Sequence, residues 1–563
     1  MEKLRNNFIK VVMLTLVVGL FTLSSCKDDE TADFAAPTIT VTPGTVQLAP
    51  NTKQTFSIAV SAEGNIGSIK LGDTEIKSYT TDTKADAFSY EYTVPATQAE
   101  GTLTLTFTVT DKQGTPETGT TTVAVTVTKT PKETVTVDAN ITANTTWSAS
   151  KYYLVKGNIF VQSGVTLTIE PGTIILGDKV TKGALIVNRG AKIEAKGTAA
   201  APIIFTSSAP KGFRNYGDWG GVVLLGKAVN NQAGTQNIEG ITATGTENGV
   251  YGAGTVTDGS TDTDNTGNFY YVRIEFAGIA LSTNNELNGL TMGSVGSGTT
   301  IHHVQVSYSG DDSFEWFGGT VGSQYLVAYR GWDDDFDTDF GYRGSNQYLA
   351  SFRDPVVADI SGSTAFESDN MNGGTNSNTP LTAAKFSNVT AFGPFVYAPL
   401  SNGALAGGNV SNNYINGLHI RRNTAIQIYN SVFVGWGKTN GINFEGANTA
   451  AVFKGNYMGR IVGTLKAISG SNGYSDANFA TDNPTIETTQ STVDLSAKIA
   501  GLTGAATLAT PSALLATSSP LLTAGSNTTV PTGLSQTAYI GAFDATNNWL
   551  TGWTNFDPNN TAY

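Results

Sequence analysis

The chain has 563 residues, of which 46 are acidic and 33 basic, and its formal charge is −13. Only 14% of the residues are charged, too few for coiled coils or helical bundles, whereas 10% are aromatic, too many for a disordered chain. A net negative surface repels phosphate backbones, so we expect no nucleic-acid partner. With 63 glycines, the composition predicts a long all-β protein with many turns.

The N-terminus predicts export. Three basic residues among the first ten precede the apolar run 11–23, which is shorter than the ~20 residues of a spanning helix. We therefore expect a signal peptide over residues 1–25. The motif Leu23-Ser24-Ser25-Cys26 resembles a bacterial lipobox and contains the single cysteine of the chain. This resemblance implies lipid attachment at Cys26, the alternative being an ordinary signal with a chance cysteine.

The residues after the cysteine favour a surface location. Lys27-Asp28-Asp29-Glu30 is similar to the acidic tag that sends Bacteroidetes lipoproteins to the outer face of the outer membrane. We expect residues 26–36 to be a flexible tether and the protein to face the extracellular medium, touching the membrane only through its lipid anchor. A solvated acidic linker without a sorting role is the alternative.

Residues 37–130 show strand periodicity. Apolar residues alternate with threonines over 103–110, and valines alternate with polar residues over 123–127. This period of two, with Gly, Asp and Asn turns, predicts an immunoglobulin-like sandwich. The segment contains no suggestive cluster of catalytic residue types, so we interpret it as a spacer.

Residues 135–563 contain internal repeats of irregular length. Segment 164–169 recurs 26 residues later, 271–278 recurs after 32, and 324–330 recurs after 23. Shifts between 20 and 35 residues with strand alternation predict a solenoid whose coils vary in length.

Two stretches suggest a family. Residues 167–175, with 190–193 and 202–206, look like the opening coils of right-handed parallel β-helices. The block 217–226 and the ending 549–556 resemble a family of Bacteroidetes surface lipoproteins. The resemblance implies a right-handed parallel β-helix with a C-terminal cap over 135–563. It also implies a TonB-dependent importer of the SusC/SusD type as partner.

Carboxylates cluster at 309–370. The motif 311–315 aligns with 333–337 at a shift of 22, and 336–339 aligns with 366–369 at a shift of 30. Coils stack ~4.8 Å apart and neighbouring strand residues face opposite sides. The alignment therefore predicts a phenylalanine stack inside the coils (Phe314, Phe336, Phe366) and an acidic ladder outside (Glu315, Asp337, Glu367).

The acidic residues suggest a Ca²⁺ site, because this hard cation takes 6–8 oxygen ligands. The alternative is a solvated acidic edge partly neutralised by Arg330 and Arg353. The residues Asp333, Asp335, Asp337 and Asp339 would share one outer face of a strand. The candidate ligands are Asp311, Glu315, Asp333, Asp335, Asp337, Asp339 and Glu367.

Catalysis is the second interpretation of the same residues. Paired carboxylates hydrolyse glycosidic bonds, and Gly310-Asp311-Asp312 is similar to one element of the polygalacturonase pattern. The other elements are missing. A calcium-dependent lyase would need a basic residue, for which Arg330 or Arg353 could serve. His302 and His303 are neighbours and would face opposite sides of a strand, so they could not share a zinc ion.

We therefore predict a non-catalytic, surface-exposed lipoprotein that binds a glycan or peptide as an accessory of a SusC/SusD-type importer. A lipid-anchored polysaccharide lyase or glycoside hydrolase is the first alternative, and an adhesin the second. Exposed indoles beside turns could stack on sugar rings, although interior packing is the commoner fate of tryptophan. The tryptophans concerned are Trp219, Trp316, Trp332 and Trp436.

Overall fold

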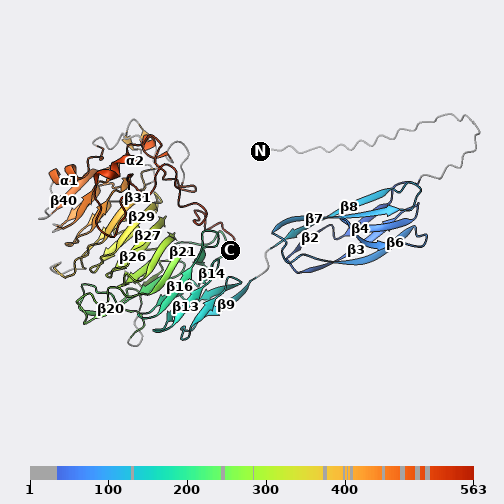
Figure 1. Ribbon diagram of the computed structural model, residues 1–563, viewed down its shortest axis with the longest axis horizontal. Helices are drawn as coiled ribbons and strands as arrows, with labels where there is room; N and C mark the ends of the chain where they lie inside the picture. Colours follow the sequence, from blue (N-terminus) through green and yellow to red (C-terminus); the bar gives the residue numbers. More distant parts are fainter. Residues whose placement is uncertain are drawn as a thin grey trace, which may run out of the picture. The chain divides into compact units, whose positions relative to one another are not determined.

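The computed structural model divides the chain into two compact units, Met1–Pro131 and Lys132–Tyr563 (Figure 1). The predicted signal peptide (1–25), Cys26 and most of the tether lie outside the described residues. The structure describes residues 34–128, 132–241, 247–282, 285–371, 377–396, 400–401, 404–405, 410–446, 450–469, 476–487, 495–500 and 508–563.

The first unit is a two-sheet β-sandwich. One sheet has the order β1-β3-β6 and the other β2-β8-β7-β4-β5. The two sheets share one core, in which the Phe56 and Phe107 rings lie 6.1 Å apart. Its relation to the immunoglobulin fold stays a prediction. The strands are β1 (Thr38–Thr42), β2 (Thr45–Leu48), β3 (Lys53–Ser61), β4 (Ile66–Leu71), β5 (Thr74–Ser78), β6 (Ala85–Thr93), β7 (Gly101–Asp111) and β8 (Thr118–Val127).

The second unit is a parallel β-helix built from two long parallel sheets. The first parallel sheet comprises β9 (Glu133–Val137), β10 (Thr145–Trp147), β11 (Lys151–Val155), β13 (Thr166–Ile169), β14 (Ile174–Gly177), β16 (Lys192–Lys196), β17 (Ile203–Ser207), β21 (Gly267–Glu275), β25 (Thr300–Ser307), β27 (Ser323–Tyr329), β29 (Ser345–Phe352), β31 (Lys385–Phe392), β35 (Gln427–Tyr429), β36 (Val432–Val434), β38 (Val452–Lys454) and β39 (Tyr457–Gly459). The second comprises β12 (Asn158–Val161), β15 (Ala184–Val187), β18 (Gly221–Leu225), β24 (Leu290–Gly293), β26 (Phe314–Phe317), β28 (Phe336–Asp339), β30 (Phe366–Ser368), β34 (Asn416–Ile420), β37 (Asn440–Glu445) and β40 (Thr464–Ser469).

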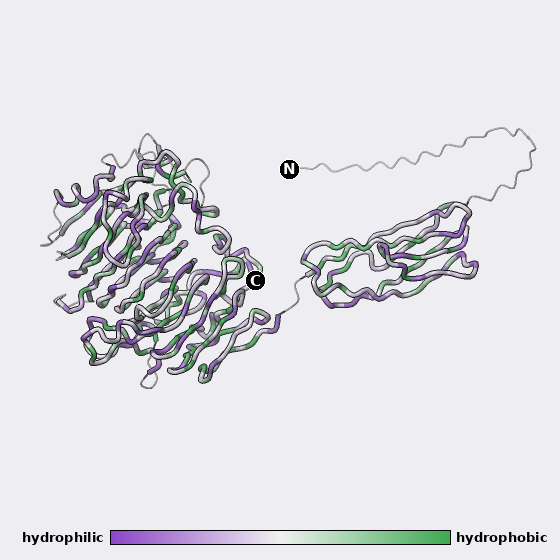
Figure 2. Tube along the Cα trace, viewed as in Figure 1, coloured by the Kyte–Doolittle hydropathy of each residue, from purple (hydrophilic) through white to green (hydrophobic). Residues whose placement is uncertain are grey.

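The pairing register confirms the repeats expected from the sequence. Thr166 pairs with Lys192, Val272 with Val304, and Gln324 with Gln347, at the predicted shifts of 26, 32 and 23 residues. Apolar residues fill the interior because alternate strand residues point inward, and hydrophobic and hydrophilic residues alternate along many strands in Figure 2.

Aromatic residues mark a bend in the coils of the first parallel sheet. Tyr271, His303, Tyr325 and Tyr348 all have a positive φ, between 48° and 64°. Each lies between two paired stretches of its strand, so the strand turns there and the ring projects outward. The rings of successive coils lie 4.4, 4.4 and 5.0 Å apart. The bend therefore repeats in register along the solenoid.

The C-terminal residues lie along the flank of the first parallel sheet. Asn388 donates to Tyr539 O and Gly541 O, Gln305 donates to Asn555 O, and Tyr563 donates to Glu275. This segment therefore runs back across successive coils. The short helices are α1 (Asp476–Asp482), α2 (Leu521–Ala524), and the 3-10 turns Leu495–Ala497 and Gly525–Asn527. Among the described helices, none has the length and apolar character needed to cross a membrane.

An insertion covers part of the outer face of the second parallel sheet. It carries the hairpin β19 (Gly234–Asn237) and β20 (Val250–Gly254), and two further hairpins are β22 (Ala280–Ser282) with β23 (Asn285–Glu286), and β32 (Leu400–Ser401) with β33 (Ala404–Leu405). Ile238, Ile241 and Tyr251 of the insertion form an apolar cluster with outward residues such as Val223 and Phe317. Beyond this cluster, the outer face becomes acidic.

Candidate acidic site

The predicted acidic ladder forms on the second parallel sheet. Glu315 pairs with Asp337, Asp337 with Glu367, and Glu367 with His419. The phenylalanines at 314, 336 and 366 stack inside, with ring centroids 5.6 and 5.2 Å apart. Full burial of each ring contributes about 2 kcal/mol, which holds the ladder strands in register.

Two turns bring further carboxylates to the start of this ladder. Asp311 and Asp312 precede β26, and Asp333 and Asp334 precede β28 on the next coil. Asp312 Oδ1 accepts a 2.7 Å hydrogen bond from Asp334 N, and Asp334 Oδ1 accepts one from Thr364 N. Each aspartate thus fixes the turn of the following coil. The predicted ligand set omits Asp312 and Asp334. The alignment of residues 311–312 with 333–334 was the sequence pattern that could have identified them.

Loops turn the ladder into a cavity of about 480 Å³. Glu239 comes from the insertion, Glu286 from β23, and Asp359 from the loop after β29. Ten carboxylates and two basic side chains line the cavity. The carboxylates are Glu239, Glu286, Asp311, Asp312, Glu315, Asp333, Asp334, Asp337, Asp359 and Glu367, and the basic side chains are His419 and Arg421.

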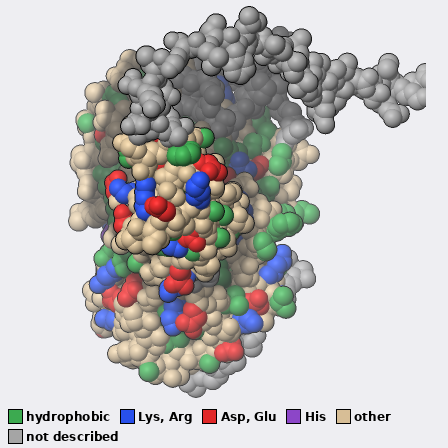
Figure 3. Space-filling view, turned by 90° about the vertical axis from the view of Figure 1, so that its right-hand side faces the viewer, with side chains coloured by type: hydrophobic (Ala, Val, Ile, Leu, Met, Phe, Trp, Pro, Cys, Tyr) green, Lys and Arg blue, Asp and Glu red, His purple; other side chains and the backbone are tan. Residues whose placement is uncertain are grey.

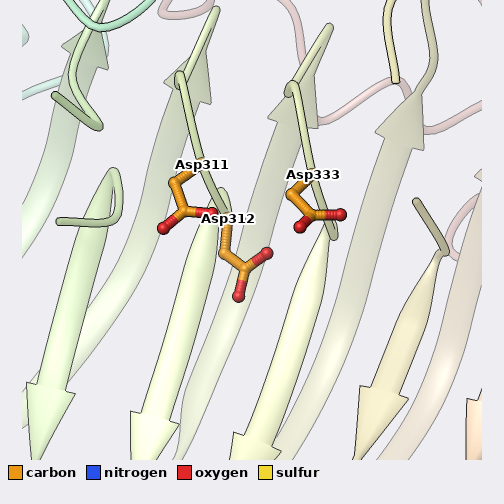
Figure 4. A group of neighbouring side chains, drawn as sticks. All are labelled: Asp311, Asp312 and Asp333. Atoms are coloured by element: carbon orange, nitrogen blue, oxygen red, sulfur yellow. The ribbon is translucent and has the colours of Figure 1, made fainter. Parts of the chain in front are cut away.

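Two groups within the cavity have the spacing of cation ligands. One oxygen from each of Asp311, Asp312 and Asp333 lies within 4.8 Å of the others, and the same holds for Asp312, Glu315 and Asp337. Figure 4 shows the first group, with Asp311 and Asp312 on one turn and Asp333 on the neighbouring turn. Oxygens bound to one Ca²⁺ at 2.3–2.6 Å lie at most about 5 Å apart. The spacing within each group therefore allows its three oxygens to contact one such ion.

Burial and mutual repulsion raise the carboxyl pKa values. Burial raises the pKa of Asp333 to about 7, with Asp359 and Glu367 adding to the rise. The pKa values of Asp312 and Glu315 are also raised well above the ordinary range, first by burial and then by neighbouring carboxylates. Asp337 shows the same pattern, with Glu315 as its strongest repelling neighbour. Full ionisation of the cavity therefore requires positive charge.

The basic residues of the cavity are largely used by one end of the ladder. Arg421 hydrogen-bonds Glu367 and pairs with Asp369 at 2.8 Å. His419 Nε2 lies 2.8 Å from Glu445. Burial lowers the pKa of His419, but Glu367 and Glu445 outweigh it and leave the pKa raised. Among the described residues, no hydrogen bond or ion pair joins either basic residue to the two ligand groups, although the charge of Asp337 helps to raise the pKa of Arg421.

The predicted common face of residues 333, 335, 337 and 339 fails at Asp335. Asp335 is fully buried and pairs with the equally buried Arg353 at 3.0 Å. Asp339 shares the outer face of β28 with Asp337, but it pairs with Phe317, accepts a hydrogen bond from Phe340 N and does not line the cavity. Asp335 departs from that face for a local reason: β28 begins at Phe336, so the turn residues before it do not follow strand alternation. Five of the seven predicted ligands meet in the cavity, namely Asp311, Glu315, Asp333, Asp337 and Glu367.

The expected roles of Arg330 and Arg353 also need correction. Arg330 pairs with Asp354 at 2.9 Å, and neither Arg330 nor Arg353 lines the cavity. Arg353 donates to Asp333 O and Trp332 O, so it supports the backbone of the acidic turn. Arg353 therefore offsets part of the charge of the acidic turn, because it pairs with Asp335 and opposes the rise in the pKa of Asp333, whereas Arg330 is paired elsewhere. Neither side chain lines the cavity, where a base would stand.

The structure also tests the predictions for the tryptophans and for the two neighbouring histidines. Trp219, Trp316 and Trp436 are fully buried, which removes them as sugar platforms, whereas Trp332 is 39% exposed. The expectation that His302 and His303 face opposite sides is wrong, because their Nδ1 atoms lie 2.9 Å apart. The positive φ of 52° at His303 interrupts the strand alternation.

The comparison with known proteins agrees with this architecture. Residues 139–511, more than half of the chain, match a family described as the pectate-lyase-like β-helix domain. No curated protein and no solved structure matches the chain. The protein therefore belongs to the family of pectate-lyase-like β-helix domains.

Proposed function

We propose that the β-helix unit binds Ca²⁺, or a similar hard divalent cation, in the acidic cavity and uses it to hold an oxygen-rich ligand. The observation that carries this proposal is the collection of ten carboxylates around one cavity with two basic side chains. Like charges on neighbouring strands destabilise a sheet. A bound cation converts that repulsion into coordination.

Unsatisfied oxygens support the same proposal. Asp333 Oδ1 and Asp337 Oδ1 are buried and have no hydrogen-bond partner among the described residues. A buried acceptor without a partner costs about 1–3 kcal/mol, and more when it is charged. Carboxylate oxygens are the ligands that Ca²⁺ prefers.

The charge pattern of the cavity is not a property of every face of the protein. On the face drawn in Figure 3, acidic and basic side chains of the described residues are interspersed. The overall charge of −13 alone therefore does not account for the cavity. The carboxylates of the cavity come from the ladder, its turns and the loops around it.

The ligand that we propose is a glycan, with a peptide as the alternative. The family description supports a carbohydrate, and a cation coordinated by protein on one side can accept sugar hydroxyls or uronate oxygens on the other. The predicted lipid anchor at Cys26 would display the protein on the outer membrane. In that setting we propose a non-catalytic accessory of a SusC/SusD-type importer, and an adhesin is the alternative.

Calorimetry on chelator-stripped full chain in mild detergent tests the cation. We expect saturable Ca²⁺ binding that Asp337→Asn weakens and that Asp339→Asn, two residues along the same strand, leaves in place. No binding at millimolar Ca²⁺ would refute the cation site. Glycan arrays with Ca²⁺ or with chelator then test the ligand, and a cation-independent pattern would remove the bridging role.

Affinity purification tests the cellular context. We expect a tagged chain to retain a TonB-dependent importer in mild detergent. Recovery of the chain without an importer would remove the accessory role, and would leave the cation site to be judged by calorimetry.

A second candidate is glycoside hydrolysis. Its supporting observation is the close group Asp312, Glu315 and Asp337, whose raised pKa values would let one carboxyl remain protonated as an acid beside an ionised partner. A lyase has less support, because Arg421 is paired with Glu367 and Asp369. Release of reducing ends from polysaccharides in chelator would favour the hydrolase, and unsaturated sugars formed only with Ca²⁺ would favour the lyase.

A further inference from the structure

We propose that the cavity holds two divalent cations that share Asp312 as a bridging ligand. This inference rests on the proposed cation binding and specifies its stoichiometry and arrangement. The two ligand groups are Asp311 with Asp312 and Asp333, and Asp312 with Glu315 and Asp337. Asp312 is the one member common to both.

The positions of the residues separate the two groups along the strand direction. The first group comes from the turns that precede β26 and β28. Glu315 and Asp337, which complete the second group, are paired residues inside those strands. In Figure 4, Asp312 lies between Asp311 and Asp333 and its carboxylate extends past them. Two-metal sites have ions about 3.5–4 Å apart, a separation that one carboxylate spans.

Charge also distinguishes two ions from one. The five carboxylates of the two groups carry five negative charges when ionised. One divalent ion would leave three of these charges uncompensated, in a cavity whose remaining walls hold five more carboxylates against His419 and Arg421. Two ions leave one. Like charges in a poorly hydrated space repel strongly, so the second ion has a large electrostatic reason to bind.

Neutral oxygens beside the second group provide an independent observation. Asn288 is 3% exposed, and its Nδ2 donates to Glu315 while its Oδ1 has no partner among the described residues. Thr291, 1% exposed, pairs with Glu315 on the next strand, and its Oγ1 is likewise without a partner. Together with the unpartnered Asp337 Oδ1, these atoms place buried oxygens without hydrogen-bond partners next to Glu315.

The bridging Asp312 and its neighbour Asp333 each keep one carboxylate oxygen free of hydrogen bonds among the described residues and therefore open to coordination. Asp312, 7% exposed, uses Oδ1 to accept from Asp334 N, and its Oδ2 has no hydrogen bond within the described part of the chain. Asp333 Oδ1 is buried without a partner on the opposite side. The bridge is therefore oriented by the backbone of the next coil before any cation binds.

The test counts ions on the full chain in mild detergent by equilibrium dialysis with radioactive Ca²⁺ and by native mass spectrometry. We expect two ions per wild-type chain and one ion in each of Asp311→Asn and Glu315→Gln. Asp312→Asn, which retains an oxygen for Asp334 N, should lower the affinity for both ions at least tenfold. Asp339→Asn is the matched control and should still bind two.

The outcomes separate this inference from the proposed function. A single ion that is lost in both Asp311→Asn and Glu315→Gln would overturn the bridged pair and leave cation binding standing. No ion in the wild type would overturn both. If two ions bind and Asp312→Asn changes the affinity for neither, the bridging role of Asp312 is overturned. Thermal melting of each variant in chelator verifies that a lost ion does not reflect an unfolded chain.

Discussion

Without cations, the β-helix unit should lose stability as the pH rises from 4 to 8. The pKa of Asp333 is about 7 in the folded chain, against the ordinary value of 3.8 that applies in the unfolded chain. Between these values the folded protein binds more protons than the unfolded one, so its free energy of unfolding falls with rising pH. The stabilising contribution is complete below pH 4 and lost above pH 7.

The size of the effect follows from the shift. A rise of about three pK units corresponds to at most about 4 kcal/mol, shared with the coupled neighbours of Asp333. With an unfolding entropy of about 2.1 cal/mol/K per residue, residues 132–563 give about 0.9 kcal/mol/K, so the melting temperature should fall by roughly 4 °C. Saturating Ca²⁺ should oppose the fall, because a ligand at 100 times its Kd adds about 2.7 kcal/mol.

The assay is thermal melting followed by circular dichroism in chelator and in Ca²⁺, at intervals from pH 4.5 to 8.5. Asp333→Asn cannot ionise and should flatten the chelator curve, whereas Glu100→Gln, an exposed carboxylate of the sandwich, should leave it unchanged. A wild-type curve in chelator that is flat or rises with pH would refute the reasoning. The same slope in Asp333→Asn would also refute it.

Three further predictions concern other parts of the chain. Cys26→Ser should keep the protein in the aqueous phase of a Triton X-114 separation, whereas wild type enters the detergent phase; equal partition would contradict lipid attachment. Arg353→Leu leaves the buried Asp335 unpaired and should cost about 3–5 kcal/mol in urea unfolding, with partial recovery on adding Asp335→Asn; an unchanged midpoint would show that the pair is dispensable. Tyr563→Phe removes a donor 2.6 Å from both oxygens of the buried Glu275 and should cost about 1–3 kcal/mol by the same measurement, unless the C-terminal segment contributes no stability.

The ladder was predictable from the sequence and the cavity was not. In a solenoid, a repeat shift is also a strand register, so the shift of 22 residues was enough to place Glu315 beside Asp337. Glu239 reaches the same cavity from an insertion that has no repeat partner, and no local pattern announces it. The prediction for Asp335 was wrong for a different reason. It extended strand alternation into a turn, where the hydrogen bond from Arg353 determines the orientation of the Asp335 side chain.

Stability alone gives no reason to place acids on three successive coils of one ladder. The coils stack about 4.8 Å apart, so like charges at equivalent positions repel along the whole run. The same ladder continues with Thr291 before Glu315, and with His419 and then Asn443 after Glu367, so neutral polar residues are compatible with this position of the coil. The loops could have supplied lysines to offset the charge, but Glu239, Glu286 and Asp359 add to it. His419 and Arg421 offset the charge only around Glu367. A positively charged ligand best accounts for the remaining carboxylates, and the two overlapping groups around Asp312 show where that charge would bind.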